Sequence, residues 1–162
     1  MKKAIAIGML GLALVSNRAA AQTAVEQAQI LRDFERSVVE YTQRHHCLSM
    51  FPEALNAATP APKIFTLPVA MVFRQTIARA LASGDAAIGG VGTAAHRAMV
   101  LQPFPTNELY DFPAVLADVL PELPATLEYR LIGNDLVIRD TVADVSVAVL
   151  RDAVGNATTV RR

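Results

Sequence analysis

The chain has 162 residues, with 15 basic and 15 acidic side chains and no formal net charge at neutral pH. This balance argues against a nucleic-acid-binding surface, because such surfaces are strongly basic. The length suits a single domain preceded by a targeting segment.

Residues 1–21 have the pattern of a secretory signal peptide. Lys2 and Lys3 form a positive region, and residues 4–15 are an uncharged apolar run. Small residues end the segment, so we predict cleavage after Ala21. The apolar run is shorter than the ~20 residues that a bilayer-spanning helix needs. We therefore expect a periplasmic or secreted domain, residues 22–162, with no stable membrane span after cleavage.

The expected mature chain is slightly acidic and has one cysteine. Loss of Lys2, Lys3 and Arg18 leaves 12 basic and 15 acidic side chains, a net charge near −3. Cys47 has no second cysteine with which to form an internal disulfide. Hydrophobic packing must therefore stabilise the domain.

The amino-terminal part of the domain is predicted to be helical. A long helix is expected over 23–48 and a second over 66–83, with Thr66 as its N-cap. Shorter helices are expected over 93–101 and over 112–120, the latter capped by Asp111. The first two helices each carry an apolar stripe at helical spacing, formed by Leu31, Phe34, Val38, Tyr41, His45 and Leu48, and by Val69, Phe73, Ile77 and Leu81.

Residues 126–140 predict an antiparallel hairpin. Gly133-Asn134 suits a two-residue type II′ or I′ turn, and this turn places Glu128 opposite Arg139. The same register gives one apolar face, which needs a covering layer. That face holds Leu127, Tyr129, Leu131, Leu136 and Ile138.

A third C-terminal element is expected over 143–150. Val145, Val147 and Val149 alternate in a pattern that favours a strand. The alternative is a short helix with Asp144 as its N-cap. Residues 152–162 are expected to form a loose tail. The predicted fold class is α+β, with helices packed on a small antiparallel sheet.

No residue is assigned a catalytic, cofactor-binding or metal-binding role. His45, His46 and Cys47 are consecutive, whereas helical metal ligands need i,i+3 or i,i+4 spacing. His96 is distant in sequence and would serve as a third metal ligand only if the tertiary fold brought it next to them. Gly89–Gly92 precedes a helix but lacks a preceding strand and the lysine of a phosphate-binding loop, so a flexible connection is favoured.

Charged residues on the hairpin and in the loops are the remaining candidates for a site. Glu128, Arg130 and Arg139 on the outer hairpin face form either a polar recognition surface or a solvated face with a weak ion pair, and the second interpretation is favoured. The acids elsewhere are scattered and define no catalytic pair. The loops 84–92 and 102–111 are the better places for a site.

A resemblance covers about half of the expected mature chain. The run LPELPATLEYRLIGNDLVIRDTVADVSVAVL, residues 120–150, resembles the C-terminal part of a family of small exported proteobacterial proteins. APKIFTLPVAMVFRQTIARAL, residues 61–81, is similar to the central helix of that family. The resemblance implies an exported single domain and carries no activity, ligand or catalytic residue.

The leading hypothesis is a non-enzymatic binding or interaction protein of the cell envelope, whose partner is an envelope protein or a small ligand. The alternative is a small envelope-acting enzyme that uses His45, His96 or loop carboxylates. Membrane-surface association through the long helix is disfavoured, because its polar face mixes acidic and basic residues.

Overall fold

The computed structural model describes residues 10–49, 62–83, 98–105 and 111–155, and the side chains of the first helix from Thr23 to His45. The order of elements is α1 (Leu10–Ser49), α2 (Leu67–Ser83), α3 (Ala114–Ala117), β1 (Leu127–Ile132), β2 (Asp135–Asp140) and β3 (Val145–Leu150). Helices packed with a C-terminal antiparallel sheet confirm the predicted α+β class.

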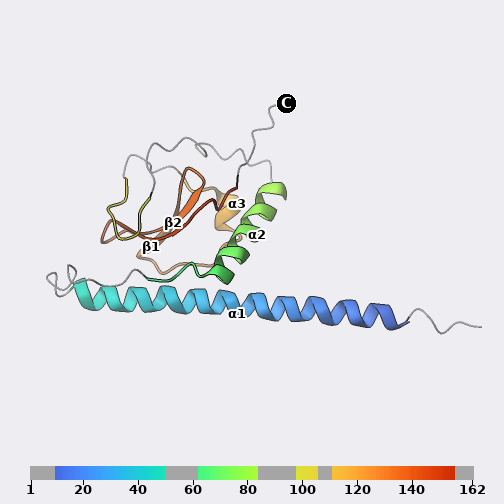
Figure 1. Ribbon diagram of the computed structural model, residues 1–162. Coiled ribbons are helices and arrows are strands. Elements are labelled where there is room, and N and C mark those ends of the chain that lie inside the picture. Colours follow the sequence, from blue (N-terminus) through green and yellow to red (C-terminus); the bar gives the residue numbers. More distant parts are fainter. Residues whose placement is uncertain (1–9, 50–61, 84–97, 106–110, 156–162) are drawn as a thin grey trace, which may run out of the picture.

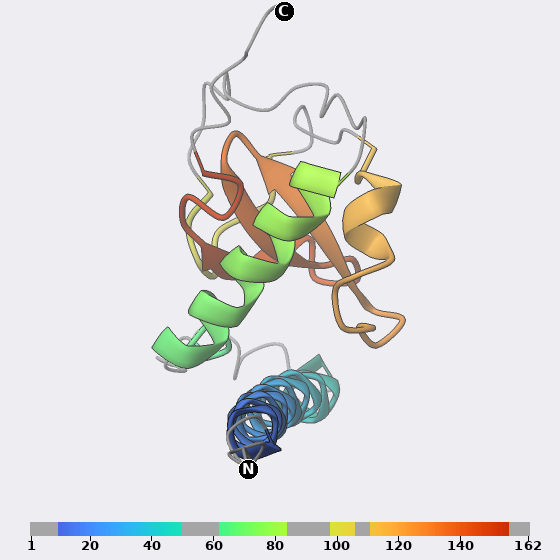
Figure 2. The same cartoon turned by 90° about the vertical axis from the view of Figure 1, so that its right-hand side faces the viewer.

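The elements form layers on one side of the sheet. Figure 1 shows α1 running beneath the rest of the molecule, with its amino-terminal end projecting beyond it. Figure 2 looks along α1 and shows α2 lying across one face of the sheet, with α3 beside α2. We call this covered face the inner face and the opposite one the outer face.

The main core joins α1, α2 and the inner face. Phe34 of α1 and Phe73 of α2 are fully buried, with ring centroids 4.8 Å apart. Phe73 also lies 6.4 Å from the ring of Tyr129 on β1. The predicted stripe of α2, the α1 stripe from Leu31 to Tyr41 and the apolar hairpin face therefore meet in one cluster, as their periodicities require. Its strand residues include Leu127, Leu136, Ile138, Val147, Ala148 and Leu150. His45 lies outside this cluster, and the side chain of Leu48 lies outside the described residues.

The hairpin has the predicted register at every position. Glu128 pairs with Arg139, Tyr129 with Ile138, and Ile132 with Asp135 next to the turn. Gly133 has a φ of 57°, whereas Asn134 is not in the left-handed region. One positive φ at the first central position identifies the turn as type II′, where glycine avoids the steric cost of a side chain.

Residues 145–150 form a strand, so the favoured interpretation of the third element is confirmed. β3 pairs with β2 in the order β1-β2-β3. The register shifts between Ile138 and Arg139, where Ala148 and Ser146 are their respective partners. Val147 is the extra residue of this bulge, and both Val147 and Ala148 are buried in the main core.

The prediction of a helix over 93–101 is wrong for residues 98–101, the described part of that range. Residues 98–101 are not helical, and Leu101 has a φ of 60°. The Leu101 N–H donates to the carbonyl of Ser146 at 2.7 Å, and Pro103 forms an isolated bridge with Val145. Backbone pairing with the edge of β3 replaces the local helical bonds, because that edge otherwise lacks a hydrogen-bond partner among the described residues. Residues 93–97 lie outside the described residues.

The helix predicted over 112–120 is much shorter in the structure. α3 spans only four residues, and Pro113 occupies the N-cap position without a side-chain hydrogen bond. The predicted cap Asp111 is therefore misplaced by two positions. Asp118 is the C-cap, and a tighter turn closed by the Val119 N–H to the Leu116 carbonyl follows. Pro121 follows this turn and cannot donate a helical hydrogen bond.

The ends of the domain also differ from expectation. α1 begins at Leu10, well before the expected residue 23, within the segment predicted as a signal peptide. Within the described residues, no helix is both long and apolar enough to cross a bilayer. At the other end, Ala153 and Val154 are buried, and Val154 donates its N–H to the Asn134 carbonyl at 3.1 Å. The chain is thus packed through the first residues of the expected loose tail.

Candidate functional site

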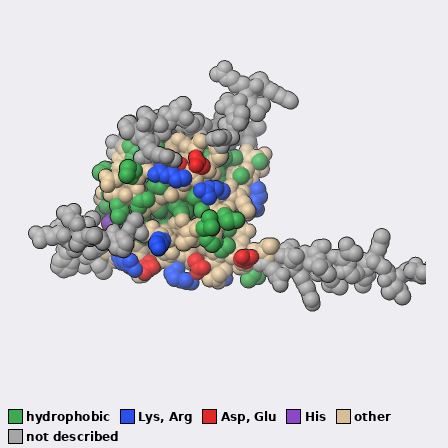
Figure 3. Space-filling view, viewed as in Figure 1, with side chains coloured by type: hydrophobic (Ala, Val, Ile, Leu, Met, Phe, Trp, Pro, Cys, Tyr) green, Lys and Arg blue, Asp and Glu red, His purple; other side chains and the backbone are tan. Residues whose placement is uncertain are grey.

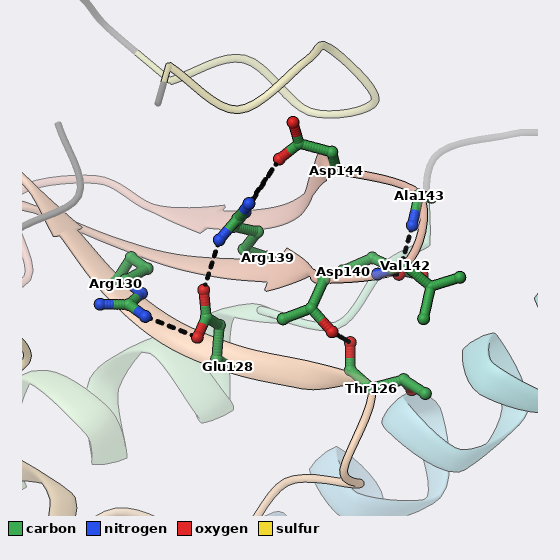
Figure 4. Close-up of polar contacts among 9 residues, drawn as sticks. Thr126, Glu128, Arg130, Arg139, Asp140, Val142, Ala143 and Asp144 are labelled. Carbon is green, nitrogen blue, oxygen red and sulfur yellow. Dashed lines mark hydrogen bonds and ion pairs between the residues drawn. The ribbon is translucent and has the colours of Figure 1, made fainter. Parts of the chain in front are cut away.

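Four charged residues on the outer face form one connected network. Glu128 accepts hydrogen bonds from Arg130 at 2.6 Å and from Arg139 at 2.8 Å. Arg139 also donates to Asp144 in the β2–β3 turn, at 2.7 Å from its closer nitrogen. Figure 4 shows these side chains on the same face of the sheet. We call Glu128, Arg130, Arg139 and Asp144 the outer-face network.

The network stabilises the charged forms of its members. The hydrogen bond from Arg130 is the main cause that lowers the pKa of the Glu128 carboxyl, and Arg139 adds to it against the opposing effect of burial. Burial acts to lower the pKa of the Arg139 guanidinium, but Asp144 and Glu128 together raise it. Two cations and two anions therefore neutralise one another within the protein.

The outer face is also partly covered, which corrects the expectation of a solvated face. Ala98 and Phe104 pack there against Ile132 and Val137 in a second, smaller core. The Arg139 guanidinium lies 5.0 Å from the centre of the Phe104 ring, within cation–π range. Residues 98–105 thus cover part of the network, and Arg139 is mostly shielded from solvent.

Asp135 lies beside this second core and joins the segment after β3 to β2. Its carboxylate accepts a hydrogen bond from Arg151 and another from the Asp152 N–H at 2.9 Å. Arg151 donates in addition to the Ala98 carbonyl, and its own carbonyl accepts from Arg74 of α2. These bonds join β2, α2 and residue 98, so the role of Asp135 is structural.

A second polar cluster lies on the inner face, between β2 and α1. Asp140 is buried and accepts hydrogen bonds from the Tyr41 hydroxyl at 3.1 Å and from the N–H groups of Val142 and Ala143, each at 2.9 Å. His45 Nδ1 lies 3.8 Å from the Asp140 carboxylate, and its ring lies 4.4 Å from that of Tyr41. Burial, followed by the Asp140 charge, raises the pKa of the Tyr41 hydroxyl.

The structure describes only some of the candidate site residues. His45 lies half-buried in the Asp140 cluster, where Tyr41 and Asp140 account for its surroundings. The side chains of His46 and Cys47, all of His96, and residues 84–92 lie outside the described residues. Among the residues that are described, no group of three or more His, Cys, Asp or Glu side chains is arranged to hold a metal ion. Of the loop 102–111, residues 102–104 run along β3.

The sequence analysis did not predict the exposed apolar patch at the start of α2. Leu67 and Met71 are one helical turn apart, and 73% and 53% of their surfaces are exposed. Figure 3 shows hydrophobic side chains gathered over the beginning of α2, beside α1. Their i,i+4 spacing opposite the buried stripe was the available signal, because it gives α2 a second apolar face. We call Leu67 and Met71 the α2 patch.

The fold and these clusters define a small α+β protein, and comparison adds nothing to that class. No family model, curated protein or solved structure matches the chain.

Proposed function

We propose that the chain is an exported, non-enzymatic binding protein of the cell envelope that contacts its partner through the α2 patch. The predicted signal peptide and the resemblance to small exported proteobacterial proteins support the location. The observation that carries the binding role is the exposure of Leu67 and Met71 on adjacent turns of α2. Contiguous exposed apolar patches mark contact sites for other molecules.

The hydrogen bonds of three carboxylates on β1 and β2 support binding rather than catalysis at these positions. Glu128 is paired with two arginines, Asp135 with Arg151, and Asp140 with Tyr41 and two backbone N–H groups. A general acid or base must instead exchange a proton with a substrate. These three carboxylates have partners within the fold that account for their positions.

The binding role is tested by affinity capture from envelope extracts with the protein purified from exporting cells. Leu67→Ser is expected to abolish capture of the partner, while Val142→Ser leaves it unchanged. Val142 is a matched control, because it is 76% exposed and lies in the β2–β3 turn. A partner captured equally by both variants would exclude the α2 patch as the contact. Turnover of an envelope substrate that depends on a polar cluster would exclude a non-enzymatic role.

Export is tested separately by cell fractionation and by the mass of the recovered protein. Cleavage after Ala21 gives a chain that begins at Gln22. Recovery of the full-length, uncleaved chain from the cytoplasm would contradict export. It would not affect the outcome of the binding test.

The second candidate is a small envelope enzyme that uses His45, and it rests on the Asp140 cluster. The Asp140 carboxylate lies 3.8 Å from His45 Nδ1, which is longer than a hydrogen bond, so a catalytic Asp–His pair would require these two groups to move closer together. This role predicts an activity that His45→Gln removes while the protein remains folded. A screen against envelope substrates in which the parent and His45→Gln proteins are equally inactive would count against it.

A further inference from the structure

The two edges of the sheet differ in the described part of the chain. Along β3, the Ser146 N–H donates to the Gln102 carbonyl and the Phe104 N–H to the Asp144 carbonyl, each at 3.0 Å. β1 forms the opposite edge. No described residue beyond the hairpin forms a backbone hydrogen bond with Tyr129 or Leu131. Open strand edges are templates for pairing with another chain.

The register identifies which backbone groups face outwards from β1. Ile132 and Asp135 flank the two-residue turn and form a hydrogen-bonded pair, and such pairs alternate along an antiparallel ladder. Arg130 and Glu128 therefore point their backbone groups towards β2, while Tyr129 and Leu131 point theirs outwards. The bond from the Thr141 N–H to the Thr126 carbonyl at 2.9 Å fits this alternation.

The sequence of β1 is complementary to itself when reversed. Leu127-Glu128-Tyr129-Arg130-Leu131 reads apolar, acidic, aromatic, basic, apolar around its central residue. A twofold axis through Tyr129 places each Glu128 opposite Arg130 of the other copy, and each Leu127 opposite Leu131. Parallel pairing in register would instead place like charges opposite each other, which is unfavourable.

The charges at this edge are suited to pairing between copies. Glu128 and Arg130 lie on the same face of β1, as Figure 4 shows, and are 26% and 22% exposed. They already bond to each other within the strand at 2.6 Å. A second copy would extend this ion-pair network across the edge, without leaving an unpaired charge in the interface.

We propose that β1 is a homodimer interface, in which two copies pair antiparallel around Tyr129 to form one six-stranded sheet. Such an interface is isologous, because the same residues serve both copies. The Tyr129 N–H of each copy donates to the Tyr129 carbonyl of the other, and each Leu131 N–H donates to the Leu127 carbonyl of the other copy. The Leu127 N–H keeps its bond to the Pro124 carbonyl at 2.8 Å within its own chain. This surface is distinct from the α2 patch, so the proposal does not depend on the proposed function.

Sedimentation velocity over a wide range of concentration tests the dimer, with Arg130→Glu as the variant. The substitution places two carboxylates opposite each other at two symmetric positions of the interface, while Arg139 still neutralises Glu128 within each copy. We expect the dissociation constant to rise at least about tenfold, equal to about 1.4 kcal/mol. Arg44→Glu is the matched control, because it makes the same charge change at the exposed Arg44–Glu40 pair on α1. It should leave the dissociation constant unchanged.

Hydrogen exchange of the unmodified protein decides the question if Arg130→Glu does not fold. Amide exchange at Tyr129 and Leu131 should slow as concentration rises, because these N–H groups become bonded only in the dimer. A protein that is monomeric throughout overturns the proposal. So does a dimer that Arg130→Glu leaves intact, or one in which the exchange of Tyr129 and Leu131 does not change with concentration.

Discussion

The guanidinium of Arg139 lies 5.0 Å from the centre of the Phe104 ring while it donates hydrogen bonds to Glu128 and Asp144. One side chain therefore connects β1, β2, the β2–β3 turn and the segment 98–105. The outer face is organised by this contact, which neither local periodicity nor the hairpin register specifies.

A double-mutant cycle measures that contact. Arg139→Met and Phe104→Leu should show a coupling free energy of about 0.5–2 kcal/mol, because each single change removes the cation–π interaction. Urea unfolding provides the four free energies of unfolding. The control cycle combines Phe104→Leu with Arg44→Met on exposed α1 and should be additive. Equal coupling in both cycles would contradict a specific Arg139–Phe104 interaction.

Glu128→Gln should lower the free energy of unfolding by about 1–3 kcal/mol at neutral pH, because it removes the negative charge shared by two half-buried arginines and replaces one acceptor oxygen with an NH2 donor. The pKa of Glu128 is lowered in the folded protein from its ordinary value of 4.5. The stabilisation is therefore complete above this value and is lost as the pH falls through the folded-state pKa.

Urea unfolding of the parent and Glu128→Gln proteins at several pH values checks this dependence. Their free energies of unfolding should converge in acid and differ most at neutral pH. Glu40→Gln is the control, because the Glu40–Arg44 pair is largely exposed and contributes little. A difference between parent and Glu128→Gln that is constant with pH would show that the ion pairs are not its source.

Asp140→Ala should destabilise the protein by about 2–4 kcal/mol, because it leaves the Tyr41 hydroxyl and two backbone N–H groups without their acceptor. Tyr41→Phe removes only one of these bonds and should cost about 1 kcal/mol. Thermal and urea unfolding give both values. The reverse order of the two variants would mean that Tyr41, rather than Asp140, organises the cluster.

Ser146→Ala should leave stability unchanged or increase it slightly. Ser146 is fully buried, and its hydroxyl has no hydrogen-bond partner in the described part of the chain. Replacing an unsatisfied buried hydroxyl by hydrogen removes a desolvation cost. A loss of more than about 1 kcal/mol in urea unfolding would show that the hydroxyl is bonded in solution.

Phe34→Ala should destabilise the domain by about 3–5 kcal/mol, because Phe34 is the fully buried residue through which α1 contacts Phe73. Val39→Ala, on the exposed side of α1, should change the free energy of unfolding by less than about 0.5 kcal/mol. Similar losses in the two variants would mean that α1 does not pack through its predicted stripe.

Sequence patterns predicted the hairpin and the packed stripes well because these depend on local order. A two-residue turn fixes which residues face each other, and a period of 3.6 or 2 fixes which side chains share a face. Glu128 and Arg139 were therefore paired correctly. Patterns were less informative about boundaries, since α3 is shorter and α1 longer than expected. The polar clusters were not predicted in this way, because their side chains contact partners that are distant in sequence.

By itself, the sequence determined the α+β class, the hairpin register and the apolar faces of α1 and α2. Only the tertiary structure decided that residues 98–104 line β3 rather than form a helix, that Phe104 covers Arg139, and that Asp140 faces Tyr41 on α1. Asp140 and Tyr41 are 99 positions apart. Local periodicity specifies which way a side chain points, whereas the choice of a distant partner follows from competition for hydrogen bonds and buried volume across the whole fold.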